Sequence, residues 1–86
     1  AINNYQSQEK LFQMAEQATS EIKSAFTRVW MFTEIAIEHF SAKRKAQAKK
    51  VLTRALKITL NIESPWSRSR ALVRLSRAFV EPIQKN

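Results

Sequence analysis

His39 is the only histidine of the chain, and it stands near two acids, Glu34 and Glu38. A glutamate and a histidine can together transfer a proton, and both can bind a metal ion. At helical spacing, however, His39 falls on the same apolar stripe as Phe32 and Ile35. We therefore expect a buried core histidine and no catalytic or metal-binding residue.

Nucleophiles and phosphate-binding loops are also scarce. The chain has no Cys and no Gly, so it has neither a thiolate nor a Gly-rich loop that wraps a phosphate, and all seven of its acids are Glu. Ser67 precedes Arg68, but no general base accompanies it in the motif. These absences predict a non-enzymatic protein with no cofactor and no small-molecule substrate.

The cationic side chains offer a different chemistry, the binding of an anion. Residues 1–42 carry three Lys or Arg against five Glu, a net charge of −2, whereas residues 43–86 carry twelve against two, a net +10. Arginine in particular forms bidentate bonds with phosphate or carboxylate. The candidate anion-binding residues follow helical spacings of three, four and seven: Lys43, Lys50, Arg54, Lys57, Arg70, Arg74 and Arg77.

Four interpretations of these cations stay open at this point. They form a solvated face, or they bind nucleic-acid backbone, an acidic protein surface or an anionic membrane surface, of which the membrane is the least favoured. Like charges four residues apart repel one another, and no Glu is interleaved between these cations, so a solubility role alone does not account for the pattern. Sequence-specific DNA binding is not indicated, because the turn glycine is missing and no Asn or Gln lies within the basic stripe of helix 65–80.

Helices must position these side chains, because a chain without glycine has few means of making tight β-turns or left-handed helix caps. Ser64 before Pro65 is a strong helix start, and Ser24 should cap an earlier helix. We expect a further break at Ser41, and an end to the last helix just before Pro82. The predicted fold is all-α, with two antiparallel helical hairpins that form a four-helix bundle or a short right-handed solenoid. The expected helices cover about 5–22, 25–41, 43–61 and 65–80.

Apolar stripes predict which sides of these helices are buried. The stripes are Leu11, Ala15, Ala18 and Ile22 in the first helix, Val51, Leu52, Ala55, Ile58, Thr59 and Ile62 in the third, and Leu72, Leu75, Ser76 and Phe79 in the fourth. Helix 25–41 has a second stripe beside its core stripe. Either this helix is sandwiched between its neighbours, or the second stripe stays partly exposed as a dimer or partner interface. The candidate interface residues are Phe26, Trp30, Ile37 and Phe40.

An offset of 40 residues aligns the two halves of the chain without a gap. Seven positions are identical, among them the pairs Ile22 with Ile62, Ser24 with Ser64, and Arg28 with Arg68. The matches include a connector of the form Ile-x-Ser-x-aromatic-Ser/Thr-Arg, which amphipathicity alone does not reproduce. We expect two repeats, one over about 5–42 and the other over about 43–82.

With its connector and the flanking segments 55–58 and 71–76, the chain resembles a degenerate tetratricopeptide-like or HEAT-like helical tandem repeat. The period of 40 and the missing glycine depart from the tetratricopeptide pattern. The resemblance implies a surface that binds other macromolecules.

The sequence thus predicts a single domain, 1–86, that acts as a protein-interaction module through its basic second half and the second stripe of helix 25–41. Its partner would be another protein or a second copy of the chain, because an acidic half complements a basic half. The alternative is nonspecific binding of the nucleic-acid backbone by the same basic faces. With no long apolar segment and no visible signal peptide, we expect a cytoplasmic protein.

Overall fold

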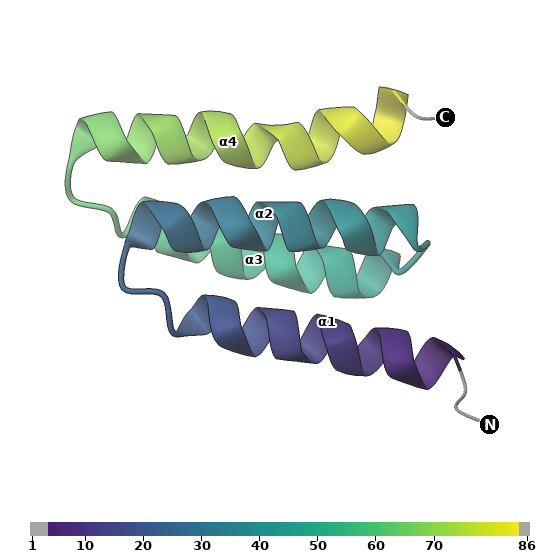
Figure 1. Cartoon of the computed structure of the whole chain (residues 1–86). Helices are drawn as coiled ribbons and strands as arrows, with labels where there is room; N and C mark the ends of the chain where they lie inside the picture. Colours follow the sequence, from purple (N-terminus) through teal and green to yellow (C-terminus); the bar gives the residue numbers. More distant parts are fainter. Residues whose placement is uncertain (1–3, 85–86) are drawn as a thin grey trace.

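The fold is all-α, as the sequence predicts. The computed structural model describes residues 4–84, and the side chains of residues 7–80. It contains the helices α1 (Asn4–Ser20), α2 (Ala25–Ser41), α3 (Lys45–Leu60) and α4 (Pro65–Gln84). Each helix runs antiparallel to the one before it, so that α1 with α2 and α3 with α4 form two hairpins (Figure 1).

Helix α2 is the centre of the molecule. It packs most extensively against α3, next against α4, and less closely against α1, while α3 also packs against α4. Helices α1 and α4 lie on opposite sides of α2 (Figure 1), and within residues 4–84 they do not approach each other. The packing is compatible with a four-helix bundle, but the α1 side is open. Helix α2 thus lies between its neighbours, but its second stripe stays partly exposed at Trp30.

The two hairpin connectors have the same hydrogen bonds. Ser24 Oγ accepts from the Thr27 backbone N–H at 3.2 Å, and Ser64 Oγ accepts from that of Ser67 at 3.3 Å, so both predicted caps are confirmed. Arginine then fixes the chain that enters each helix. Arg28 Nη1 donates to the carbonyl of Ile22 at 2.6 Å, and Arg68 Nη1 donates to that of Ile62 at 3.0 Å.

Removing a cap should destabilise the protein measurably. We expect Ser64→Ala to lower the free energy of unfolding by about 1 kcal/mol, because the N–H of Ser67 loses its acceptor. Urea denaturation followed by circular dichroism measures the change. The control is Thr53→Ala on an exposed position of α3, whose hydroxyl bonds only to its own helix. This control should be neutral or slightly stabilising, since alanine is the better helix former; equal losses in the two variants would contradict the cap assignment.

The turn between α2 and α3 has a residue other than glycine in the left-handed conformation that ends a helix. Lys43 adopts a left-handed conformation with φ of 62°. The N–H of Lys43 bonds to the carbonyl of Phe40 at 3.0 Å, and that of Arg44 to the carbonyl of His39 at 2.8 Å, which is the Schellman pattern of helix ends. The break after Ser41 is therefore confirmed, but α3 begins at Lys45, two residues later than the expected start at about residue 43.

The last helix also differs from the prediction, because α4 continues through Pro82 to Gln84. A proline in a helix loses the hydrogen bond of its own nitrogen, but it does not prevent the preceding residues from being helical. Here only two helical residues follow the proline, so the loss falls in the final turn. The expected end before Pro82 is wrong.

The core lies between α2, α3 and α4. Its buried apolar residues are Val29, Phe32, Ile35, Ala36, Ile37, Val51, Leu52, Ala55, Ala71, Leu75 and Ala78. His39 is buried with them, as expected. The predicted stripe of α3 is confirmed, with Thr59 buried and both Ile58 and Ile62 packed against the core.

The outer helices are rotated relative to their predicted faces. In α1, Leu11, Ala15 and Ala18 are exposed, although Ile22 is half-buried. In α4, Leu72, Ser76 and Phe79 are exposed, and Leu75 alone of the predicted stripe is buried. Small residues explain the difference in α4, since Ala71 and Ala78 let this helix approach its neighbours closely.

Candidate functional site

An open groove of about 400 Å³ runs between α2 and α4. It joins two sets of residues that the sequence proposed separately, the aromatic residues of α2 and the arginines of α4. The lining residues are Phe26, Trp30, Ser69, Arg70, Val73, Arg74 and Arg77. We call this the arginine–aromatic groove.

The guanidinium groups of the groove are held on aromatic rings. Arg74 lies over the ring of Trp30, 4.2 Å from its centroid, and its Nη2 donates to Glu34 Oε1 at 3.3 Å. Arg70 lies over two rings, 5.2 Å from the centroid of Phe26 and 4.9 Å from that of Trp66. Such contacts restrict the side chains without using the edge of the guanidinium, although the edge of Arg74 already donates to Glu34.

Positive charge and apolar surface therefore occur together in the groove. Three arginines line it and one acid, Glu34, lies beside it, so the local charge is positive. Arg74 Nε is buried and has no hydrogen-bond partner. Trp30 is 41% exposed and Val73 is 69% exposed, so each offers apolar area next to the cations. Aromatic and arginine side chains of this kind dominate binding energy at protein interfaces.

The predicted cations of the α2–α3 turn and α3 do not join this groove. Lys43 lies in the turn, and Lys50 and Lys57 are exposed on α3. Arg54 turns towards α1 and α2, where it lies 4.5 Å from the centroid of Phe32 and pairs with Glu16 at 3.5 Å. The cations of α3 and α4 thus do not form one continuous basic side.

The four candidate interface residues of α2 have different environments. Ile37 is buried in the core, and Phe26 and Phe40 are partly buried against it. Trp30 is the most exposed of the four. The surface contribution of this stripe is therefore made by Trp30, with Phe26 in the lining of the groove.

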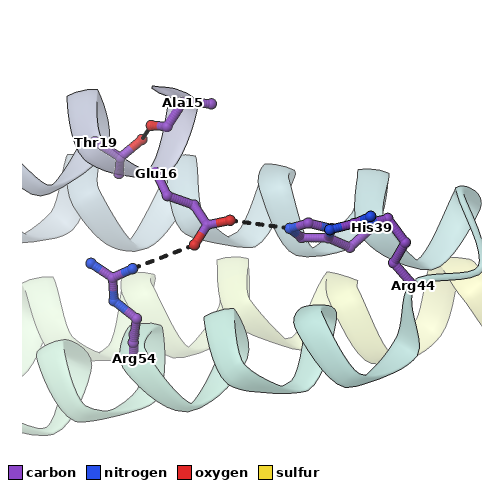
Figure 2. A network of polar contacts seen from close by, with 6 residues as sticks. All are labelled: Ala15, Glu16, Thr19, His39, Arg44 and Arg54. Atoms are coloured by element: carbon purple, nitrogen blue, oxygen red, sulfur yellow. Dashed lines mark hydrogen bonds and ion pairs between the residues drawn. The ribbon is translucent and has the colours of Figure 1, made fainter. Parts of the chain in front are cut away.

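A polar network that the sequence did not reveal joins α1, α2 and α3 (Figure 2). His39 Nε2 lies 3.2 Å from Glu16 Oε2, and Glu16 also pairs with Arg54. Arg44 Nε donates to His39 Nδ1 at 3.3 Å, so Nδ1 must accept and the ring proton lies on Nε2. The ring of Phe12 stacks on His39 with centroids 3.9 Å apart.

This network has the features of a structural contact. His39 is covered by Phe12 and holds no open position for a substrate. Across the described range 4–84, no three His, Cys, Asp or Glu side chains lie where they could share a metal ion. The expected neighbours of His39, Glu34 and Glu38, are not its partners, since Glu34 pairs with Arg74. Glu16 lies on α1, 23 residues before His39, so only the packing of α1 on α2 identifies it as the partner of His39.

Comparison with known proteins gives no relative. No protein-family model matches the chain, and neither a curated protein nor a solved structure matches it. None of the helices over residues 4–84 combines the length and the apolar character that crossing a bilayer requires.

Proposed function

We propose that this protein is a non-enzymatic helical-repeat module that binds an acidic segment of a partner protein in the arginine–aromatic groove. The observation that carries the proposal is the placing of arginines on exposed aromatic rings beside Val73. A partner that presents carboxylates next to apolar side chains would satisfy both the guanidinium edges and the apolar area.

The recurring hydrogen bonds support the helical-repeat part of the proposal. Besides the serine caps and the arginine bonds to isoleucine carbonyls, a threonine bond recurs at the same offset. Thr19 Oγ1 donates to the carbonyl of Ala15 at 2.7 Å, and Thr59 Oγ1 donates to that of Ala55 at 2.8 Å. Repeated local structure of this kind agrees with the resemblance to tetratricopeptide-like and HEAT-like arrays, which bind macromolecules on their surfaces.

Nucleic acid is the competing partner, because the three arginines of the groove could equally contact phosphates. Two features favour a protein instead. The guanidinium of Arg74 already covers Trp30, and that of Arg70 covers Trp66, whereas binding of single strands needs free ring faces for stacking. Val73, moreover, adds exposed apolar area that a phosphate backbone would not use.

Charge reversal in the groove tests the proposal. The probe is a synthetic amphipathic peptide with glutamates beside leucines, and fluorescence of Trp30 in a Trp66→Phe background reports binding. We expect Arg70→Glu with Arg77→Glu to weaken binding at least about tenfold, or ~1.4 kcal/mol, because carboxylates then face carboxylates. Arg74 is left unchanged, since a carboxylate there would lie against Glu34.

The matched control is Lys49→Glu with Lys57→Glu, which makes the same change of charge on the exposed part of α3. It should bind the peptide nearly as well as the original protein. Equal losses in the two double variants would show a general effect of net charge and would contradict a groove. An oligonucleotide that binds more tightly than the peptide, with affinity falling steeply with salt, would assign the groove to nucleic acid.

A further inference from the structure

Large exposed apolar side chains are frequent on α1 and α4, the two helices on either side of α2. On α1 these are Leu11 and Met14, which are 64% and 58% exposed. On α4 the exposed apolar residues are Leu72, Val73, Phe79 and Val80. Two such faces on one small chain are unusual unless something covers them.

The offset of 40 residues relates both faces to a junction that is buried inside the molecule. Leu11 and Ala15 of α1 correspond to Val51 and Ala55 of α3, which are buried in the core where α3 packs on α2. Exposed Leu72 of α4 likewise corresponds to Phe32 of α2. On α1, therefore, the exposed residues match those that α3 buries against α2. On α4, the exposed Leu72 matches a residue of α2 that α3 covers.

We infer that a second copy of the chain packs its α1–α2 hairpin on α4 in the way that the α3–α4 hairpin packs on α2 within one copy. This inference names a partner for the arginine–aromatic groove, and so it rests on the proposed function. Each internal contact between the hairpins can be shifted by 40 residues to give the pair of residues that would meet between two copies.

The shifted contacts of α3 give apolar pairs. Arg54 corresponds to Met14 of the second copy, and its two partners, Phe32 and Glu16, correspond to Leu72 and Leu56. The internal contacts of Arg54 with Phe32 and Glu16 thus become contacts of Met14 with Leu72 and Leu56. All three residues of the new contacts are exposed in one copy. A charged and aromatic contact inside the molecule is replaced by a fully apolar one between molecules.

The shifted contacts of α4 bring complementary groups to the groove. The contact of Arg70 with Phe26 becomes one of Trp30 of the second copy with Trp66, an aromatic pair. The contact of Arg74 with Trp30 becomes one of Glu34 of the second copy with Arg70, a pair of opposite charges. The ion pair of Arg74 with Glu34 becomes one of Glu34 of the second copy with Arg74. Since that Glu34 also pairs with Arg74 of its own chain, it would bridge two copies. None of these shifted contacts brings like charges together.

The arrangement is head to tail, because one copy uses α1 and α2 where its neighbour uses α4. In a pair, the copy that uses its α4 face keeps a free α1 face, and the other copy keeps a free α4 face. The contact can therefore repeat along an open array. A two-fold dimer, in contrast, would use both faces at once and stop at two copies.

Two single substitutions and their mixture test the inference. Met14→Glu blocks the α1 face, and Leu72→Glu blocks the α4 face. The control Lys57→Glu changes an exposed residue on another side of α3 from Leu56. Light scattering and sedimentation measure mass over a concentration series, with circular dichroism to check folding. We expect the original protein and Lys57→Glu to grow beyond a dimer, and each blocked variant to lose association at least about tenfold.

The equimolar mixture of the two blocked variants is decisive. Each supplies the face that the other has lost, so the mixture should form a dimer and no larger species. A monomeric original protein at every concentration, or a mixture that stays monomeric, overturns the inference. Peptide binding is measured in parallel on the double variant Met14→Glu with Leu72→Glu, which retains the groove residues. A failure of assembly and a failure of groove binding are therefore recorded separately.

Discussion

Replacing Phe32 with alanine is expected to lower the free energy of unfolding by about 3–5 kcal/mol. Phe32 is 1% exposed, and it is the largest of the fully buried side chains over the described residues. Its removal leaves a cavity in the core beside α3, and it also takes the ring from beneath the guanidinium of Arg54. Domains of this size are stable by about 5–15 kcal/mol, so the variant should be partly unfolded at moderate temperature.

Leu72→Ala is the matched control, because Leu72 occupies the same position of the second hairpin but is 41% exposed. It should cost well under half as much as Phe32→Ala in thermal or urea denaturation of the dilute protein. Equal costs for the two substitutions would mean that the core does not centre on α2.

Removing Glu16 is expected to detach α1 from the rest of the protein. Glu16 joins a buried histidine on α2 to Arg54 on α3. Helix α1 packs on α2 less extensively than α3 or α4 does. Glu16→Ala leaves the Nε2–H of His39 without an acceptor, a loss of about 1–3 kcal/mol. Hydrogen exchange should show faster exchange of the α1 amides, while those of α2 and α3 change less.

Glu16→Gln separates the two roles of the carboxylate. Its amide oxygen can still accept from His39, but it carries no charge for Arg54, so the loss should lie between that of Glu16→Ala and zero. Glu9→Ala, at an exposed position of the same helix, should leave exchange in α1 unchanged. Exchange that is unaffected by Glu16→Ala would show that apolar packing alone holds α1.

Local signals in the sequence predicted the features that depend on neighbouring residues. A serine three residues before a free backbone N–H caps a helix regardless of the rest of the fold, so Ser24 and Ser64 could be identified directly. The stripe of α3 was also correct, because this helix has one apolar side that packs between two others.

Features set by the packing of distant helices were not predictable in the same way. Helix α1 offers two adjacent sides, Leu11 with Ala15 and Phe12 with Thr19, and the sequence does not say which of them meets α2. The groove was foreseen only as two separate groups of residues. Periodicity places Arg70 and Trp30 on their own helices, but it does not specify the crossing that brings the guanidinium of Arg74 onto Trp30.

The central position of α2 sets the cooperativity of folding. The first predicted repeat ends after α2, yet the core consists of α2 with the following hairpin. Neither hairpin alone would bury Val51 and Ala55 together with Phe32, so we expect neither to be a stable folding unit by itself. We expect the smallest cooperative unit to be α2, α3 and α4, so its boundaries would differ by one helix from those of the predicted repeats.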